Sequence, residues 1–238
     1  MSRRVSHSLL DPFIAPLVPT LYRALPIPRR FPPEGLVILG HLIAIGGAVG
    51  FALSTRFWWG GLLAAIGVAG NHLCDMIDGT HARRTGQCRN GGELLDHFFD
   101  PLSFSFWMVG LGVAAARLDL SLAVVIAIYA TAVMTSIRAK ITGEFSLSRF
   151  GPTEFKALLI ILGIALAATS LADGATESVV IWSLWALAVL GVLQLVVGLV
   201  QSVRDVNASS APPDTSEWTR PDEQHDATAS SCVDADSP

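Results

Sequence analysis

The sequence is poor in charge and in cysteine. Charged residues make up 15% of its 238 residues, whereas soluble domains carry about 25%, and the mean hydropathy is +0.51. The three cysteines, Cys74, Cys88 and Cys232, form no CxxC pair and give no support for a disulfide framework or a zinc site. A soluble enzyme, a nucleic-acid-binding domain, a secreted disulfide-rich protein and a disordered protein are therefore all disfavoured.

What the sequence has instead is a series of apolar runs with almost no charge. Their lengths match the roughly 20 residues that a helix needs to cross a bilayer. We therefore predict an all-α polytopic membrane protein with six transmembrane helices. The spans are expected near Gly35–Leu53, Trp58–Cys74, Glu93–Ala116, Leu120–Thr135, Phe155–Ala172 and Val179–Val200.

The two ends of the chain differ in composition from the expected six-helix domain, residues 35–206. Residues 1–34 are predicted to be a cytoplasmic N-terminal segment, in which Leu9–Leu25 mixes apolar residues with prolines and lies on the membrane surface. Residues 207–238 carry seven acids and a single base, Arg220, and have little to bury. This part is predicted to be a disordered acidic cytoplasmic tail.

Lysine and arginine positions give the orientation. With a cytoplasmic N-terminus, 14 of the 16 cations fall in cytoplasmic segments, Lys156 beside the fourth loop among them, and only Arg56 and Arg117 fall outside. The positive-inside rule requires such a distribution, alternating loop by loop. We therefore predict a multi-pass integral membrane protein with both termini in the cytoplasm.

Four aspartates lie where the second expected span ends and the third begins. Asp75 and Asp78 are three residues apart and Asp96 and Asp100 are four apart, so each pair shares one helix face. Acids near the hydrocarbon are costly and mark functional sites. Four converging carboxylates repel one another unless a cation lies between them, and such hard oxygen ligands favour Mg²⁺, Mn²⁺ or Ca²⁺ over zinc. Two metal ions bridged by shared carboxylates are the arrangement that serves phosphoryl transfer.

The residues around the acids fit the same chemistry. Gly79 and Gly92 allow a substrate to approach the backbone closely. Arg83 is placed to hold a phosphate by paired hydrogen bonds. Asn71, one turn before Asp75, is expected to hydrogen-bond and position that acid.

From Asp75 the sequence reads D-x-x-D-G-x-x-A-R-x(8)-G-x-x-x-D-x-x-x-D. This pattern resembles the motif of the CDP-alcohol phosphotransferase family of integral membrane enzymes, with no departure in identity or spacing. The resemblance implies transfer of a substituted phosphate from a CDP-linked donor to a hydroxyl, with release of CMP, at a cytoplasmic site holding two Mg²⁺ or Mn²⁺ ions. It assigns the metal ligands to Asp75, Asp78, Asp96 and Asp100, the general base to Asp100, and the cytidine diphosphate contacts to Gly79, Ala82, Arg83 and Gly92.

Donor and acceptor remain open between two branches of the family. The stretches CDMIDGTHARRT and GELLDHFFDPLS, and the later Thr153-Glu154, are more similar to choline/ethanolamine phosphotransferases. Those enzymes move phosphocholine or phosphoethanolamine from its CDP ester to diacylglycerol. The compact length is more similar to CDP-diacylglycerol-dependent phosphatidyltransferases, which act on glycerol phosphate, serine, inositol or inositol phosphate. A Pro-Asn-x-x-Thr stretch common before the first span is replaced here by PEGLV at residues 33–37.

Four residues outside the motif have two interpretations each. Arg138 and Lys140 either hold a phosphate of the acceptor or anchor the fourth span at the membrane surface. Glu154 is either a head-group contact or a charge at a helix N-terminus. His97 either assists as a base or orients a neighbouring motif acid.

Other features of the sequence bear on competing interpretations. A cation transporter explains four intramembrane carboxylates, but it does not explain Arg83, the glycines or the placement of every acid at one end of a span. His72 and His81 are expected to be incidental, and His41 a hydrogen-bonded core histidine. Glycine-rich stretches such as 46–47 can pack helices closely, so a homodimer is a further expectation.

Overall fold

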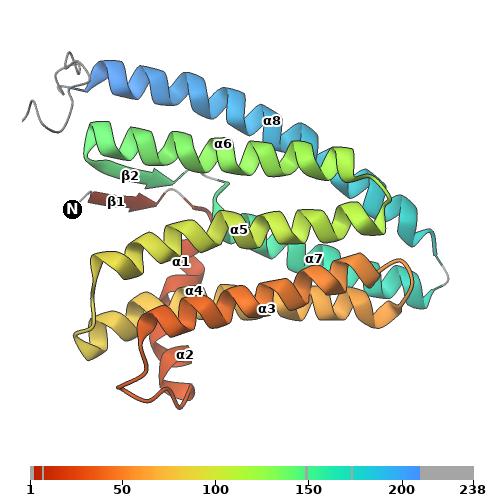
Figure 1. Cartoon of the computed structure of the whole chain (residues 1–238), viewed down its shortest axis with the longest axis horizontal. Coiled ribbons are helices and arrows are strands. Elements are labelled where there is room, and N and C mark those ends of the chain that lie inside the picture. The colour runs from red at the N-terminus through yellow and green to blue at the C-terminus, as the bar shows by residue number, and fades with distance from the viewer. Residues whose placement is uncertain (1–2, 7, 148–149, 173, 210–238) are drawn as a thin grey trace, which may run out of the picture. The chain divides into compact units, whose positions relative to one another are not determined.

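The structure is a computed structural model of the chain that describes residues 3–6, 8–147, 150–172 and 174–209. Among these residues the body consists of long helices that run side by side (Figure 1). The predicted tail lies outside the described residues from position 210 onward, whereas residues 207 and 208 belong to the last helix. The long helices are α3 (Pro33–Leu53), α4 (Trp58–Thr85), α5 (Asn90–Ala114), α6 (Leu118–Thr142), α7 (Pro152–Leu171) and α8 (Thr176–Ala208).

Five of these helices, α3, α4, α6, α7 and α8, are long and apolar enough to cross a membrane. This confirms the expected all-α polytopic membrane class. The exception is α5, because His97, Asp100 and Pro101 lower the hydropathy of its first half, and so the sixth span stays a prediction. Helix α4 extends beyond the expected end at Cys74 and stops at Gly86, whose φ of 71° is the left-handed conformation that commonly ends helices.

The N-terminal segment, residues 8–25, is helical with breaks. It consists of α1 (Asp11–Ile14), a 3₁₀ turn η1 (Ala15–Leu17) and α2 (Val18–Ala24). Each piece has a proline at its second position, because proline is tolerated in the first turn of a helix and not in its interior.

Two buried side chains fasten this N-terminal segment to the long helices. Glu154 of α7 accepts hydrogen bonds from the Ser8 hydroxyl at 2.6 Å and from the backbone N–H groups of the next two residues. His81 of α4 is 2.8 Å from the Tyr22 hydroxyl through Nδ1 and 2.8 Å from the Phe31 carbonyl through Nε2. Because a carbonyl only accepts, Nε2 donates and Nδ1 accepts. His81 is therefore an anchor and not an incidental residue.

Close backbone contacts hold α3, α4, α5 and α7 together. A Cβ atom on Gly67 of α4 would collide with the backbone of Gly47 in α3, and one on Gly61 would lie 2.5 Å from the backbone N of Ala167 in α7. Trp107 of α5 is fully buried and donates from Nε1 to the Ala44 carbonyl at 2.9 Å. Small residues thus let these helix backbones approach one another.

The all-α prediction missed one short pair of strands. Strand β1 (Arg3–Ser6) pairs in parallel with β2 (Glu144–Leu147), with Arg3 opposite Glu144. Each strand has four residues, and its partner lies far away in the sequence. No local pattern could therefore have indicated the pairing.

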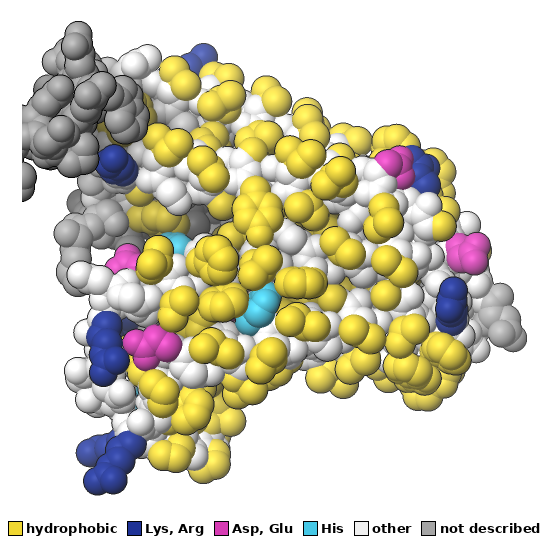
Figure 2. Space-filling view, in the orientation of Figure 1, with side chains coloured by type: hydrophobic (Ala, Val, Ile, Leu, Met, Phe, Trp, Pro, Cys, Tyr) yellow, Lys and Arg dark blue, Asp and Glu magenta, His cyan; other side chains and the backbone are white. Residues whose placement is uncertain are grey.

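The connections α4–α5 and α6–α7 lie at one end of the helices, together with β1 and the end of α8 (Figure 1). We call this the site end, and the connections α3–α4, α5–α6 and α7–α8 form the opposite end. On the face shown in Figure 2, charged side chains gather toward both ends and the surface between them is largely apolar. This distribution matches a protein whose middle is covered by lipid.

Candidate active site

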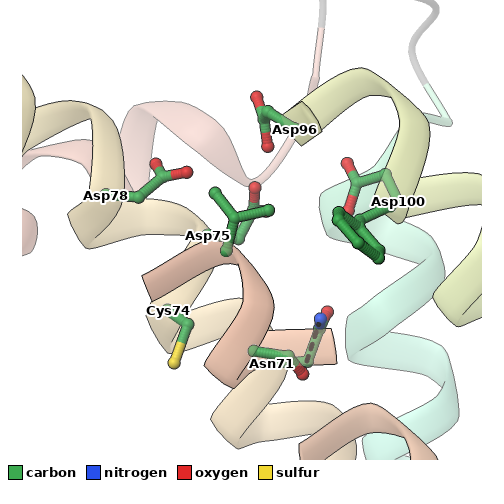
Figure 3. A pocket seen from close by; sticks show the side chains of 9 residues that line it. Asn71, Cys74, Asp75, Asp78, Asp96 and Asp100 are labelled. Carbon is green, nitrogen blue, oxygen red and sulfur yellow. Dashed lines mark hydrogen bonds between the residues drawn. The ribbon is translucent and has the colours of Figure 1, made fainter. Parts of the chain in front are cut away.

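The four motif aspartates face one another across the site end of α4 and α5. Asp75 and Asp78 project from the continuing helix α4, and Asp96 and Asp100 project from α5 (Figure 3). All four border one cavity of about 10 Å³, close to the smallest volume that holds a water molecule. The sequence prediction that two consecutive helices bring the four acids to one place agrees with this geometry.

Three of these acids form a cluster of the kind that holds a metal. Asp75, Asp96 and Asp100 each offer a carboxylate oxygen, and these oxygens lie within 4.8 Å of one another. Asp78 borders the same cavity, but its Oδ1 accepts a hydrogen bond from the backbone N–H of Gly79. An all-oxygen set of ligands fits a hard divalent cation such as Mg²⁺ or Mn²⁺.

A buried lysine lies against this cluster. Lys156, in the second turn of α7, has 0% of its side chain exposed, and its Nζ donates to Asp75 Oδ2 at 2.7 Å and to Asp100 Oδ1 at 3.0 Å. The sequence predicts Lys156 as a cation beside the fourth loop, and the structure adds that its side chain is buried rather than at the surface. A buried ammonium must be paired, and the acids are its partners. One lysine against four carboxylates leaves the site strongly negative and still attractive to a divalent cation.

Asn71 does not make the hydrogen bond to Asp75 that was expected of it, and His97 contacts Glu93 and β2. The Asn71 side chain donates from Nδ2 to the Gly40 carbonyl at 3.2 Å, and its Oδ1 is buried with no partner among the described residues. Asn71 still borders the acid cavity. His97 Nε2 lies 3.9 Å from Glu93 Oε1, and its ring packs against Phe145 of β2.

The predicted cytidine diphosphate contacts lie on the turns next to the acids. Gly79, Ala82 and Arg83 are on the last turns of α4, and Gly92 is in the first turn of α5. Arg83 is exposed and donates from Nη2 to the Thr80 hydroxyl at 3.4 Å. None of the four is among the described residues that line the acid cavity. A ligand touching them would therefore lie outside that cavity.

The remaining candidates are engaged elsewhere. Arg138 of α6 forms an ion pair with Asp205 of α8 at 3.3 Å, and Lys140 is exposed. Glu154 also accepts a hydrogen bond from the Gly151 N–H at 2.9 Å, at the start of α7. The geometry thus favours the helix-terminus interpretation of Glu154.

Two sequence relatives of known identity match part of this chain. Cholinephosphotransferase 1 of Homo sapiens is 47% identical over 58 residues, which cover 24% of this chain and 14% of the human protein. The Bos taurus cholinephosphotransferase 1 is 46% identical over 57 residues, with the same shares covered. The chain therefore matches only a small part of the length of these relatives.

A solved structure covers far more of the chain. The Mycobacterium tuberculosis phosphatidylinositol phosphate synthase with CDP-DAG bound aligns with a TM-score of 0.50, at 20% identity, over 88% of this chain and 100% of that chain. At that identity the likeness establishes the fold alone. The sequence profile described as CDP-alcohol phosphatidyltransferase matches residues 34–196, which include every motif residue. The chain belongs to the CDP-alcohol phosphatidyltransferase family.

Proposed function

We propose that this protein transfers phosphocholine or phosphoethanolamine from its CDP ester to a diacylglycerol hydroxyl and releases CMP. The observation that carries the proposal is the 47% identity to human cholinephosphotransferase 1 over 58 residues. The alternative is a CDP-diacylglycerol-dependent transfer to a small polar alcohol. It is supported by the CDP-DAG-bound neighbour, which this chain covers completely.

The carboxylates are proposed to hold two Mg²⁺ or Mn²⁺ ions. Asp75, Asp96 and Asp100 would hold one ion, and Asp78 would hold the other together with the shared Asp75. Bound divalent ions neutralise a diphosphate and stabilise the charge that develops on departing CMP. The support for this assignment is the set of three oxygens within 4.8 Å of one another and the absence of any nitrogen or sulfur ligand among them.

Asp100 is proposed to be the general base. The acceptor oxygen forms a bond to the donor phosphorus, the bond from phosphorus to the CMP oxygen breaks, and CMP leaves with that electron pair. The acceptor proton passes to a carboxylate oxygen of Asp100. Because Lys156 Nζ is bound to Asp100 Oδ1 and to Asp75 Oδ2, it fixes the orientation of both carboxylates. We assign Lys156 as a positioning residue on this ground.

The donor is proposed to lie over the site end, outside the small acid cavity. Gly79, Ala82, Arg83 and Gly92 would contact its cytidine diphosphate, with the exposed guanidinium of Arg83 against phosphate oxygens. Asn71 lines the acid cavity, and its Oδ1, which has no partner among the described residues, could accept from a ligand or coordinate a cation. His97 remains a candidate auxiliary base, paired with Glu93.

The site end is proposed to face the cytoplasm. Arg56 and Arg117 lie at the opposite end, in the connections after α3 and α5. The site end has the larger share of cations, and the positive-inside rule assigns such an end to the cytoplasm. Cations on the described residues of the site end include Arg23, Arg29, Arg30, Arg83, Arg84, Arg89, Arg138, Lys140 and Arg204.

The test is product formation by the purified protein in lipid micelles with Mg²⁺ or Mn²⁺. One arm supplies CDP-choline or CDP-ethanolamine with diacylglycerol, and the other supplies CDP-diacylglycerol with glycerol phosphate, serine, inositol and inositol phosphate. Product in the first arm, lost on chelation of the metal, is the expected result. Product in the second arm alone would establish the alternative donor.

A further inference from the structure

A second cavity, of about 210 Å³, lies between the N-terminal segment and helices α4 and α7. The N-terminal segment is tied to α7 through Glu154 and to α4 through His81, so it spans the space between these anchors. A further bond, from the Thr153 hydroxyl to Asp11 Oδ1 at 2.8 Å, closes one side of the cavity. The cavity is partly open to its surroundings, and the elements that line it are fixed to one another.

His72 of α4 borders this cavity and lacks the contacts that a buried histidine normally makes. Its side chain is 13% exposed, and both ring nitrogens are buried without a hydrogen-bond partner among the described residues. The nearest charged group is Asp75 Oδ2, 3.9 Å from Nδ1. Buried polar atoms are almost always paired, and an orphan needs an explanation. A ligand hydroxyl or ester carbonyl in the cavity would supply the missing partner.

Asp75 connects the two cavities. It lines the small acid cavity and also this larger one. A hydroxyl bound beside His72 therefore lies against a carboxylate whose oxygen is within 4.8 Å of one from Asp100. This is where the acceptor of the proposed reaction has to arrive.

The chemistry of the walls selects the kind of acceptor. Beside the polar residues, Ile14, Val18 and Met76 make one side apolar. None of the described residues that line the cavity is a lysine or an arginine, and two are acids, Asp11 and Asp75. A phosphorylated acceptor would meet two acids there, and the described lining offers it no lysine or arginine to bind its phosphate. An uncharged alcohol with an apolar body fits instead.

The outer face of the same segment indicates where such a ligand would come from. Phe13 is 75% exposed and Leu17 is 62% exposed. An amphipathic segment with large apolar side chains on its outer face lies in the membrane interface. The N-terminal segment therefore covers the cavity at the level where lipid alcohols reside.

We infer that this cavity is the acceptor site and that it takes an uncharged lipid alcohol of the diacylglycerol type. The hydroxyl end lies at His72 and Asp75, and the acyl chains leave along Ile14, Val18 and Met76. The inference rests on the proposed function and deepens it, because it assigns the acceptor to a place and to a chemical class.

The first experiment places a large side chain in the cavity by substituting a residue of the N-terminal segment. Both Ala15 and Leu17 are exposed, but Ala15 is among the residues that line the cavity and Leu17 is not. Ala15→Trp is expected to raise the apparent KM for diacylglycerol about tenfold or more, with the KM for CDP-choline within about twofold of wild type. Leu17→Trp is the matched control and is expected to behave as wild type. Equal behaviour of the two variants would overturn the site assignment.

The second variant removes the two unpaired ring nitrogens of His72 and keeps an aromatic ring in their place. His72→Phe is expected to raise the KM for diacylglycerol while the melting temperature stays equal or rises, because an unsatisfied polar group leaves the interior. A lower melting temperature with an unchanged KM would show a purely structural role for His72 and contradict the inference.

A binding measurement separates this inference from the proposed function. A diacylglycerol carrying a diazirine on its acyl chain, irradiated with wild-type protein without donor or metal, is expected to label residues 11–18 or 72–76. Ala15→Trp should lose this label and Leu17→Trp should keep it. If wild type makes product from diacylglycerol but the label falls elsewhere, the site assignment is wrong and the function stands. If only CDP-diacylglycerol with a polar alcohol gives product, the proposed function fails, and the inference fails with it.

Discussion

Of helices α4 and α8, the more apolar one, α8, is the less buried inside the protein. The most apolar stretch of α8 has a mean hydropathy of 2.3, and 22% of that stretch is buried inside the protein. The corresponding stretch of α4 has a lower mean hydropathy, 1.3, and 50% of it is buried. In a soluble protein the more apolar helix would be the more buried one. Here lipid replaces water around α8, so high hydropathy marks contact with lipid, and the less apolar helix lies inside.

The two helices also differ in how they make contact. Helix α4 packs through glycines, at Gly61 and Gly67, where no Cβ fits against the neighbouring backbones. Helix α8 instead exposes large side chains, such as Trp182 at 72% and Leu193 at 55%. Helix α4, which carries two of the four motif acids, is thus in close contact with neighbouring helices, whereas much of α8 is not.

The largest effect should follow from removing a motif acid. Asp100→Asn is expected to lower turnover about a thousandfold or more, because it removes the proposed base and a metal ligand together. The protein should remain folded in detergent, as size-exclusion chromatography and circular dichroism would show. Asp205→Asn on α8 is the matched control and should retain turnover within about twofold. Substantial turnover by Asp100→Asn would contradict the assigned base.

The next effect concerns the buried lysine. Lys156→Met leaves Asp75 and Asp100 without their cation, so it should destabilise the metal-free protein by roughly 3–5 kcal/mol and reduce kcat about a hundredfold. Since the site becomes more negative, the variant should also bind Mn²⁺ more tightly, and Mn²⁺ should recover much of the stability.

Melting temperature and Mn²⁺ titration, each with and without metal, would measure these changes, with Lys156→Arg as the charge-keeping control. A lysine that only anchors α7 at the membrane surface would leave Mn²⁺ affinity unchanged.

Sequence reasoning located the acids but not their lysine. The acids follow a local spacing within α4 and α5, and local spacing fixes which helix face a residue occupies. Lys156 lies near the end of an apolar run, where a cation ordinarily reaches toward the surface. Its partner Asp75 is 81 residues away in the chain, so only tertiary packing shows that it is buried.

The attachment of the N-terminal segment was hidden for the same reason. Its breaks follow from the prolines and could be predicted, but the bond from Ser8 to Glu154 spans 146 residues. An acidic residue such as Glu154 at the start of a helix can cap the helix, bind a ligand or bond to a distant segment, and the neighbouring sequence does not distinguish these roles. The cavity beneath the N-terminal segment depends on that attachment, so it could not be predicted from the sequence either.

A pair of glycine substitutions sharpens the contrast between the helices. Gly67→Ala on α4 places a Cβ against the Gly47 backbone and is expected to destabilise the protein by about 1–3 kcal/mol. Gly191→Ala on α8 places its Cβ 3.5 Å from that of Ala127, which is ordinary contact, and should be neutral or stabilise by about 0.5–1 kcal/mol. Thermal unfolding in the same detergent would compare them. Equal shifts would mean that the two helices tolerate added bulk alike.

The smallest effect should come from the ion pair between α6 and α8. Arg138 and Asp205 are 3.3 Å apart, and the Asp205 side chain is 56% exposed, so water weakens their attraction. Arg138→Ala should therefore change stability by about 1 kcal/mol or less and leave the KM of every substrate within about twofold. The same variant tests the alternative acceptor, because an arginine that held an acceptor phosphate would raise the KM for inositol phosphate or glycerol phosphate when removed. Such a rise, absent in Asp205→Asn, would move the acceptor site from the cavity beside α4 toward α6 and would favour a phosphorylated alcohol over diacylglycerol.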